Sequence, residues 1–257
     1  MIRLVLSALT LLALGVPAGA EPAPAVERWG VFELTLEGPR DGNPFADVDL
    51  SAEFTSGDRS VRVTGFYDGD GTYRVRFMPD RLGEWTYWTE SSAPALDGQR
   101  GAFTCTPATE DNHGPVQVRG TFHFAYADGS PYRQIGTTSY AWIHQTRELQ
   151  QQTLETLAAS PFNKMRMCVF PKDYVYNQNE PEFYPFARNE GGENVYTRFD
   201  PAFWHHLEAR ILDLQKLGIE ADIILFHPYD RWGYAEMDDD TDDFYLRYAL
   251  ARLSAFR

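Results

Sequence analysis

The sequence contains 257 residues, carries a formal net charge of −14 and is 14% aromatic. This length suits one or two domains, and the negative charge argues against nucleic acid or an anionic membrane surface as a partner, because both are themselves anionic. Abundant aromatic rings are compatible with stacking on sugar faces and equally with large cores, so composition alone names no substrate.

The N-terminus has the pattern of a secretory signal peptide. A positively charged start at residues 1–3 precedes an apolar run at residues 4–16, and residues 18–20 form a small-residue cleavage site. The apolar run is shorter than the roughly 20 residues that span a bilayer. We therefore expect a signal peptide over residues 1–20 and a secreted or periplasmic protein without a membrane anchor after cleavage.

Residues 26–107 have the pattern of short strands separated by turns. The segments VDLSAEF, SVRVTGFY, TYRVRFM and EWTYWTE alternate, or nearly alternate, between apolar and polar residues. The DGDG sequence at residues 68–71 is a strong hairpin signal between two of them. This pattern predicts an immunoglobulin-like antiparallel β-sandwich over residues 26–107. The polar, proline-containing stretch after it predicts a linker over residues 108–119.

Beyond the linker, residues 120–257 alternate between strand and helix patterns. A hairpin is expected around Asp128-Gly129, and its second strand leads to Ile135. Helices are expected over residues 146–159, 200–218 and 242–256, strands over residues 163–170 and 219–226, and an irregular loop over residues 171–199. This order predicts a parallel sheet covered by helices. The order alone leaves two arrangements, an open sheet or the first three βα units of a (β/α)8 barrel.

Polar and aromatic side chains follow each of the three predicted strands. The carboxyl ends of parallel strands meet at one edge of a sheet, which is where barrels and open sheets bind their ligands. We therefore expect a binding site at this edge. Its candidate residues are Tyr140, Trp142, Arg166, Lys172, His227, Tyr229, Asp230 and Trp232.

Several stretches of the sequence are similar to a known enzyme family. RMCVFPKDYVYNQNEPEFYPF and TRFDPAFWHHLEARILDLQKLGIEADIILFHPYDRWGY resemble the start of the barrel in the apiosidase-like group of bacterial glycoside hydrolases, and RWGVFELTLEGP with NPFADVDLSAEF resembles the small β-sandwich domain that precedes it. The resemblance implies a retaining hydrolase without a cofactor that acts on a plant- or microbe-derived polysaccharide or oligosaccharide. It also implies that Arg166 and His227 line the sugar subsite, since they match an arginine on strand two and a histidine at the end of strand three.

The resemblance also indicates which parts of the family's site are missing from this sequence. The two catalytic glutamates of the family lie on barrel strands four and seven, whereas only three βα units are recognisable before Arg257. We therefore expect the N-terminal part of a longer hydrolase, without catalytic residues of its own and inactive alone. A complete three-unit domain would leave the apolar strand at residues 219–226 with an unpaired edge, which is an aggregation hazard.

Each candidate side chain has a chemical role and a structural alternative. Arg166 can keep a nucleophilic carboxylate ionised, or it can pair with a core carboxylate. His227 can donate to a sugar hydroxyl, or it can simply end its strand, because a proline follows it. Asp230 can bind two sugar hydroxyls, or it can pair with the neighbouring arginine or with solvent. Trp142 or Trp232 can stack on a sugar ring, and Trp232 can equally be rim packing.

Other titratable groups are interpreted as structural. His205, His206 and Glu208 share a predicted helix without the H-E-x-x-H order of a metalloprotease, and we expect them on its solvated surface. Cys105 and Cys168 fall in different predicted domains and are expected to be unpaired, and no Cys/His spacing indicates a zinc site. The long loop is expected to hold exposed carboxylates at Glu180, Glu182, Glu190 and Glu193.

Three functions remain open from the sequence. The first is an exported glycoside hydrolase with a carbohydrate substrate. The alternative is a non-catalytic carbohydrate-binding protein that uses the sandwich and the aromatic residues. The third is a metal-dependent barrel hydrolase that uses His227 and Asp230, but the strand ends offer fewer than the three or four ligands that a metal usually takes.

Overall fold

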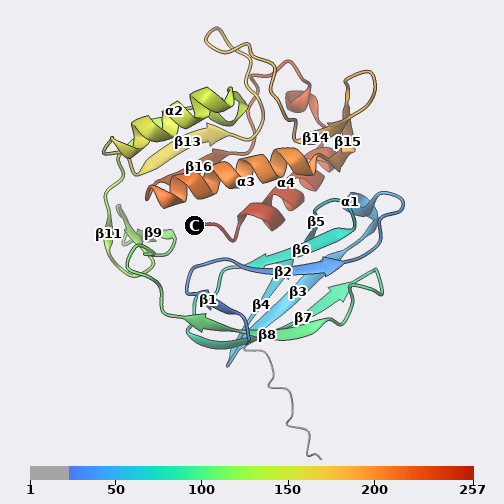
Figure 1. The fold of residues 1–257 in the computed structure, drawn as a ribbon, viewed down its shortest axis with the longest axis vertical. Coiled ribbons are helices and arrows are strands. Elements are labelled where there is room, and N and C mark those ends of the chain that lie inside the picture. Colours follow the sequence, from blue (N-terminus) through green and yellow to red (C-terminus); the bar gives the residue numbers. More distant parts are fainter. Residues whose placement is uncertain (1–22) are drawn as a thin grey trace, which may run out of the picture.

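The computed structural model describes residues 23–257, so the predicted signal peptide at residues 1–20 lies outside the described residues. Figure 1 shows two packed parts, one rich in strands and one in which strands and helices occur together. The fold class is therefore β plus α/β. Within residues 23–257, no helix is long and apolar enough to cross a membrane.

The β-rich part consists of two facing sheets. Its elements are β1 (Ala25–Glu27), β2 (Phe32–Glu37), α1 (Pro44–Asp47), β3 (Leu50–Ser56), β4 (Arg59–Thr64), β5 (Phe66–Tyr67), β6 (Thr72–Phe77), β7 (Gly83–Ser91) and β8 (Arg100–Thr106). The strand orders are β1-β8-β7-β3-β4 and β2-β6-β5, and only the β1–β8 pair is parallel. Phe54, Trp85 and Phe103 are fully buried between the sheets. Apolar and polar residues alternate along the strands, so the apolar side chains of each strand share one face. These apolar faces pack together between the two sheets and form the core.

The hairpin expected at residues 68–71 joins β5 to β6, which pair in antiparallel fashion. Gly69, Asp70 and Gly71 all have positive φ, at 92°, 49° and 80°. Glycine adopts this region without the steric penalty that a side chain brings, which explains the two glycines of the turn. The same turn carries Asp68 to the boundary between the two parts of the molecule.

A small antiparallel sheet lies between the two parts. It consists of β9 (Val116–Arg119), β10 (His123–Tyr126) and β11 (Pro131–Tyr132), in the order β11-β10-β9. The hairpin around Asp128-Gly129 is confirmed between β10 and β11. The prediction of a linker over residues 108–119 is wrong at its end, because residues 116–119 form β9. Gly120, with a φ of 61°, lets the chain reverse between β9 and β10.

The second part of the molecule alternates strands with helices. Its parallel sheet has the order β12-β13-β16 and consists of β12 (Gly136–Thr138), β13 (Lys164–Cys168) and β16 (Glu220–Ile224). The helices are α2 (Arg147–Ala158), α3 (Pro201–Lys216) and α4 (Asp239–Leu253). Thr146 and Asp200 accept hydrogen bonds from the first turns of α2 and α3, as their capping role predicts. Helix α4 begins before the predicted residue 242, because Asp238 caps it.

Residues 171–199 are not irregular throughout, which corrects the prediction. Their second half forms an antiparallel pair of β14 (Phe186–Arg188) and β15 (Asn194–Phe199). Phe186 and Phe199 are 0% and 2% exposed, and their rings stack with 4.9 Å between centroids. The pair is stable in this place because its aromatic residues complete the core of the α/β part.

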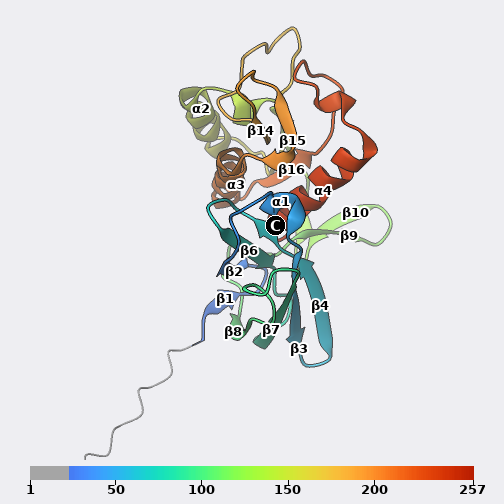
Figure 2. The ribbon, with the colours of Figure 1, turned by 90° about the vertical axis from the view of Figure 1, so that its right-hand side faces the viewer.

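The parallel sheet has one apolar and one polar face. Figure 2 shows α2 and α3 on the same side of the strands, and Met165 and Met167 of β13 are fully buried in the core that includes these helices. Side chains of paired residues in a parallel ladder share a face, so Arg166 and its partner Asp222 lie on the opposite side. This second face is open to solvent at Arg166, whose side chain is 47% exposed.

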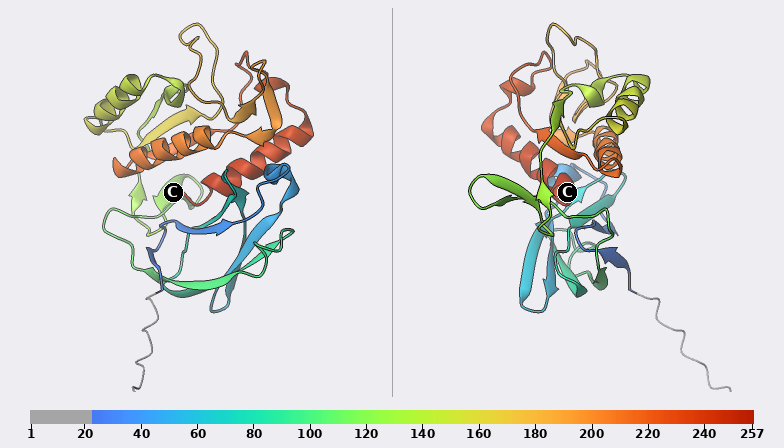
Figure 3. Two further views of the ribbon diagram at one scale, coloured as in Figure 1. Left: turned by 45° about the vertical axis from the view of Figure 1, so that its right-hand side comes forward. Right: turned by 90° about the vertical axis from the view of Figure 1, so that its left-hand side faces the viewer.

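A buried ionic network joins the two parts. Arg252 of α4 is fully buried, and its guanidinium donates to Asp68 and to Glu208 of α3, each at 2.6 Å. Arg76 of β6 donates to the other oxygen of Glu208 at 3.0 Å, and His205 of α3 lies 2.9 Å from Asp68. The prediction of a solvated helix surface is wrong for Glu208, which is buried where the helices meet the sandwich (Figure 3). It is confirmed for His205, whose side chain is 53% exposed although it reaches Asp68.

Removing one partner from the network should destabilise the protein strongly. Asp68→Asn removes one of the two carboxylates that pair with the buried Arg252 and leaves only Glu208, and breaking such a buried pair costs about 3–5 kcal/mol. Chemical denaturation at neutral pH measures the free energy of unfolding. Asp58→Asn is the matched control, because the Asp58 side chain is 89% exposed in its pair with Arg81 and should contribute little. Equal effects of the two substitutions would contradict an anchoring role for the network.

The network should also make the protein sensitive to acid. Burial by itself raises the pKa of Asp68, but bonds and charges from His205, Arg252 and Arg74 outweigh it and hold the pKa well below its usual value. A carboxyl with a lowered folded pKa contributes stability above its unfolded pKa of about 3.9 and loses it as the pH falls further. Between pH 7 and pH 3, Asp68→Asn should therefore lose less stability than the unsubstituted protein. An equal acid-induced loss would show that Asp68 does not carry this sensitivity.

Candidate functional site

The loops after the three parallel strands meet at one edge of the sheet. Their backbones bond directly, with the Cys168 N–H donating to the Tyr140 carbonyl and the Asp173 N–H donating to the Tyr229 carbonyl, each at 2.9 Å. Figure 1 shows the loop after β13 projecting beyond this edge. Residues from three strand ends therefore form one continuous surface.

Three of the candidate residues lie together, because the rings of Tyr140 and Tyr229 flank the ammonium of Lys172. The Nζ of Lys172 lies 4.0 Å from the ring centroid of Tyr140 and 4.6 Å from that of Tyr229. Tyr174, which the candidate set omitted although it lies just beyond Lys172 in the same loop, is the third ring at 4.8 Å. The ring quadrupoles attract the ammonium, so these side chains hold one another in place. We call these four side chains the tyrosine–lysine cluster.

Arg166 lies on the polar face of the sheet. Its Nε donates to Asp222 of β16 at 2.8 Å, and Lys164 lies 2.6 Å from the same carboxylate. Burial by itself raises the pKa of Asp222, but the two cations outweigh it and lower the pKa. Pairing with a carboxylate was the open alternative for Arg166, and the strand register supplies that carboxylate. The Nη atoms have no partner within residues 23–257, so they are free for a ligand.

Both ring nitrogens of His227 are bonded to the backbone. Nδ1 accepts from the Tyr229 N–H at 3.1 Å, which places the ring proton on Nε2, and Nε2 donates to the Phe170 carbonyl at 3.1 Å. Burial is the main cause of a lowered imidazole pKa, which favours the neutral ring that these bonds require. The expectation that His227 donates to a sugar hydroxyl is therefore corrected. In this structure it ties the loops after β13 and β16 together.

Asp230 is bonded within its own loop. One carboxylate oxygen accepts from the backbone N–H groups of Trp232 at 2.6 Å and Gly233 at 2.7 Å, and the other accepts from that of Ala235 at 2.7 Å. The loop folds around this carboxylate and continues into the short helix η2 (Tyr234–Glu236). Asp230 therefore shapes its own loop, and its binding of sugar hydroxyls stays a prediction.

The two tryptophans of the candidate set differ in burial. Trp142, in the short helix η1 (Trp142–His144), is 1% exposed, and its indole N–H donates to the Gln150 carbonyl at 3.2 Å. The expectation that Trp142 stacks on a sugar is therefore wrong, because its ring belongs to the core. Trp232 is half-buried, packs against that core and donates its indole N–H to Glu180 at 2.7 Å. This agrees with rim packing.

Glu180 fastens the long loop to the strand-end surface. Besides the Trp232 indole, it binds the Arg231 guanidinium at 2.9 Å and accepts from the Tyr184 hydroxyl. Burial by itself raises the pKa of Glu180, but these bonds and charges outweigh it and lower the pKa. A glutamate with a lowered pKa is ionised near neutral pH and is unsuited to acid catalysis. The sequence interpretation as an exposed loop carboxylate missed this structural role.

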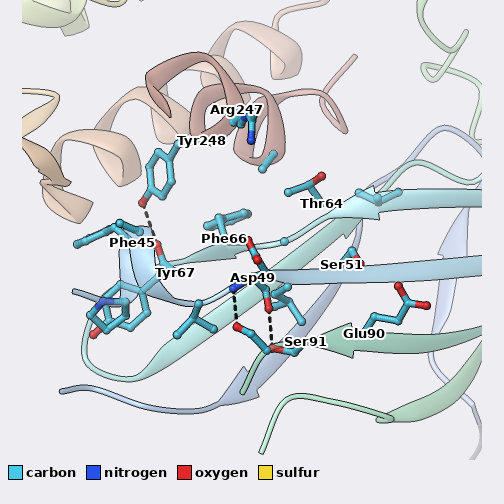
Figure 4. Close-up of a pocket in the computed structure, with 18 of the residues that line it drawn as sticks. Phe45, Asp49, Ser51, Thr64, Phe66, Tyr67, Glu90, Ser91, Arg247 and Tyr248 are labelled. Carbon is cyan, nitrogen blue, oxygen red and sulfur yellow. Dashed lines mark hydrogen bonds between the residues drawn. The ribbon is translucent and has the colours of Figure 1, made fainter. Parts of the chain in front are cut away.

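A large groove lies away from these loops. It has a volume of about 1030 Å³ and runs between the sandwich and α4. Figure 4 shows Tyr248 of α4 pointing across it to Tyr67, and the Tyr248 hydroxyl donates to the Tyr67 carbonyl at 2.9 Å. None of the candidate residues lines this groove, so size alone does not locate the site.

The described residues contain no cluster of side chains that could bind a metal ion together. Within residues 23–257, no three His, Cys, Asp or Glu side chains are placed to hold an ion together. His227 and Asp230, the pair considered for a metal-dependent hydrolase, are bonded to backbone groups instead. Cys105 and Cys168 are buried and unpaired, as predicted, and burial raises the pKa of the Cys168 thiol to about 11.

The bonds of His227 should contribute to stability. His227→Ala removes both and leaves the Phe170 carbonyl and the Tyr229 N–H without this partner, and one unsatisfied buried group costs about 1–3 kcal/mol. Chemical denaturation measures the effect. His123→Ala, at an exposed position of β10, is the control and should change the free energy of unfolding little. If the two variants have the same free energy of unfolding, the hydrogen bonds of His227 do not stabilise the protein.

Comparisons with known proteins found one family model and several solved structures. Residues 25–92 match DUF5060, a domain of unknown function. A candidate glycoside hydrolase from Bacteroides vulgatus ATCC 8482, known from its crystal structure, is 49% identical with a TM-score of 0.88, over 91% of this chain and 48% of that chain. A family 39 glycoside hydrolase from Bacteroides cellulosilyticus WH2 is 11% identical over 90% of this chain and 40% of that chain, but its TM-score of 0.25 carries no argument. No curated protein matches the chain.

The similarity to the Bacteroides vulgatus protein covers both parts of the molecule. The chain spans about half the length of that protein, 48% of it, while 91% of the chain itself is matched. The chain is therefore similar, over nearly all of its length, to a candidate glycoside hydrolase.

Proposed function

We propose that the chain is part of an exported glycoside hydrolase that cleaves a plant- or microbe-derived polysaccharide or oligosaccharide with retention of configuration. The observation that carries the proposal is the 49% identity to the candidate Bacteroides vulgatus hydrolase over 91% of this chain, at a TM-score of 0.88. The N-terminal apolar run with its cleavage site supports export. The resemblance of LFHPYDRWG and its surroundings to the apiosidase-like group supports retention.

The proposed architecture is a sandwich domain at residues 26–107 followed by the first three units of a (β/α)8 barrel at residues 120–257. Parallel strands with helices packed on one face support this, because a barrel carries its helices outside and its second strand face inside. Arg166 and Asp222 would then face the interior near the carboxyl ends of the strands. That end of a barrel holds the active site.

The catalytic pair is proposed to lie on strands other than the three described. Retaining hydrolysis needs two carboxyl groups about 5–5.5 Å apart, one as nucleophile and one as acid and base. Three carboxylates near the described strand ends are bonded already, Asp222 to cations, Asp230 to backbone amides and Glu180 to its loop. The free Nη atoms of Arg166 can hold a carboxylate from another strand ionised, since a nearby guanidinium favours the charged form.

A non-catalytic carbohydrate-binding protein is the second candidate. It is favoured by exposed rings beside the strand ends, because Tyr229 is 57% exposed and Tyr176, in the loop after β13, is 88% exposed. Flat rings in such positions can stack on sugar faces without any chemistry. The two candidates differ in whether the whole protein turns a substrate over.

Hydrolysis assays separate the two candidates. The full-length protein should release reducing sugar from at least one member of a panel of polysaccharides and aryl glycosides. A polypeptide of residues 21–257 should release none, because the catalytic pair is proposed to lie on other strands. Binding without turnover by the full-length protein would favour the second candidate. Turnover by residues 21–257 that Glu180→Gln abolishes would overturn the placement of the catalytic pair on other strands.

A further inference from the structure

Lysine is rare in this sequence, and Lys172 has unusual neighbours. The sequence holds only Lys164, Lys172 and Lys216. Lys164 pairs with Asp222 at 2.6 Å, and Lys216 pairs with Asp213 at 3.0 Å. Within the described part of the chain, Lys172 has no carboxylate oxygen within 4.0 Å, and the tyrosine rings of the cluster surround its Nζ instead.

The rings position the ammonium without satisfying its hydrogen-bonding capacity. The ring quadrupoles attract the positive charge, but an ammonium has three N–H donors, and no oxygen of the described chain accepts from Lys172 Nζ within hydrogen-bonding distance. Holding a lysine side chain in one conformation normally opposes binding through lost rotamer entropy. The tyrosine rings already order this side chain in the free protein. A ligand that binds Lys172 therefore loses less free energy to side-chain ordering.

Nearby carboxylates do not neutralise this cation. Asp230 is bonded to the backbone amides of its loop, and Asp222 is bonded to Lys164 and Arg166. Asp173 follows Lys172 directly, but its carboxylate forms no ion pair in the described part of the chain. The formal net charge of −14 opposes binding of acidic polymers elsewhere on the protein. A local cation at the strand ends therefore provides a specific place for an anionic group.

We propose that the tyrosine–lysine cluster recognises the carboxylate of an acidic sugar, a uronic acid unit of the substrate. This inference deepens the proposed function and rests on it. Lys172 donates charge-assisted hydrogen bonds to the carboxylate, and Tyr229, which is 57% exposed, stacks on the apolar face of the sugar ring. A neutral sugar can use the rings but gains no ion pair, so the ammonium provides the discrimination.

Calorimetric titration of the full-length protein tests the proposal. The probes are methyl β-D-glucuronide with methyl β-D-glucoside, and methyl α-D-galacturonide with methyl α-D-galactoside, because each pair differs only at C6. At least one uronide should bind about 10- to 100-fold more tightly than its neutral counterpart, as a charge-assisted hydrogen bond would give. Lys172→Met should abolish this ratio, and Lys172→Arg should restore much of it. Lys216→Met is the matched control and should leave the ratio unchanged.

Two results would overturn the proposal. The first is that neither uronide binds more tightly than its neutral counterpart, and the second is that the preference survives in Lys172→Met. If Lys172→Met does not fold, as judged by circular dichroism and melting temperature, Lys172→Gln takes its place. If the full-length protein hydrolyses neutral polysaccharides but shows no preference for uronides, the acidic-sugar proposal is wrong and the hydrolase proposal stands. If the protein binds uronides selectively but hydrolyses no substrate, the hydrolase proposal is wrong and the acidic-sugar proposal stands.

Discussion

The arrangement of the molecule depends on the buried contact of Arg252 with Asp68 and Glu208. Charges taken out of water contribute little net stability even when they are paired, but an unpaired one is strongly destabilising. The contact therefore favours an orientation of the sandwich and the α/β part in which Arg252, Asp68 and Glu208 stay paired. Because α3 precedes β16 and α4 follows it, holding both helices against the sandwich also holds the strand that leads to His227.

The strand-end surface combines bonded groups with free ones. His227, Asp230 and Glu180 bond within the protein and join the loops to one another. The Nη atoms of Arg166 and the ammonium of Lys172 have no such partners among the described residues. A binding site requires both kinds of group, because recognition needs donors that are free and a supporting shell that keeps them in place. His227, Asp230 and Glu180 therefore fix the positions of the loops, and Arg166 and Lys172 provide the donors that a ligand can contact.

Local signals predicted the elements that they control and missed those that depend on distant contacts. Thr146 and Asp200 marked the starts of α2 and α3, because a cap acts on the adjacent turn. The β14–β15 pair escaped prediction, because Phe186 and Phe199 are buried by a core assembled from other segments. Glu208 was misplaced for the same reason, since this part of the helix packs against a sandwich that lies far away in sequence.

The sequence by itself determined most of the strands and helices, their alternation and the strand ends at which polar and aromatic residues collect. These features follow from periodicity, caps and turns, which act over a few neighbouring residues. Only the tertiary structure decided which of those side chains remain free for a ligand. His227 donates to the Phe170 carbonyl, and Arg166 pairs with Asp222. Within the described residues the Lys172 ammonium has no carboxylate within 4.0 Å and lies over tyrosine rings instead. The physical reason is that hydrogen-bond partners come from neighbouring strands and loops, whose register and approach are set by folding rather than by spacing along the chain.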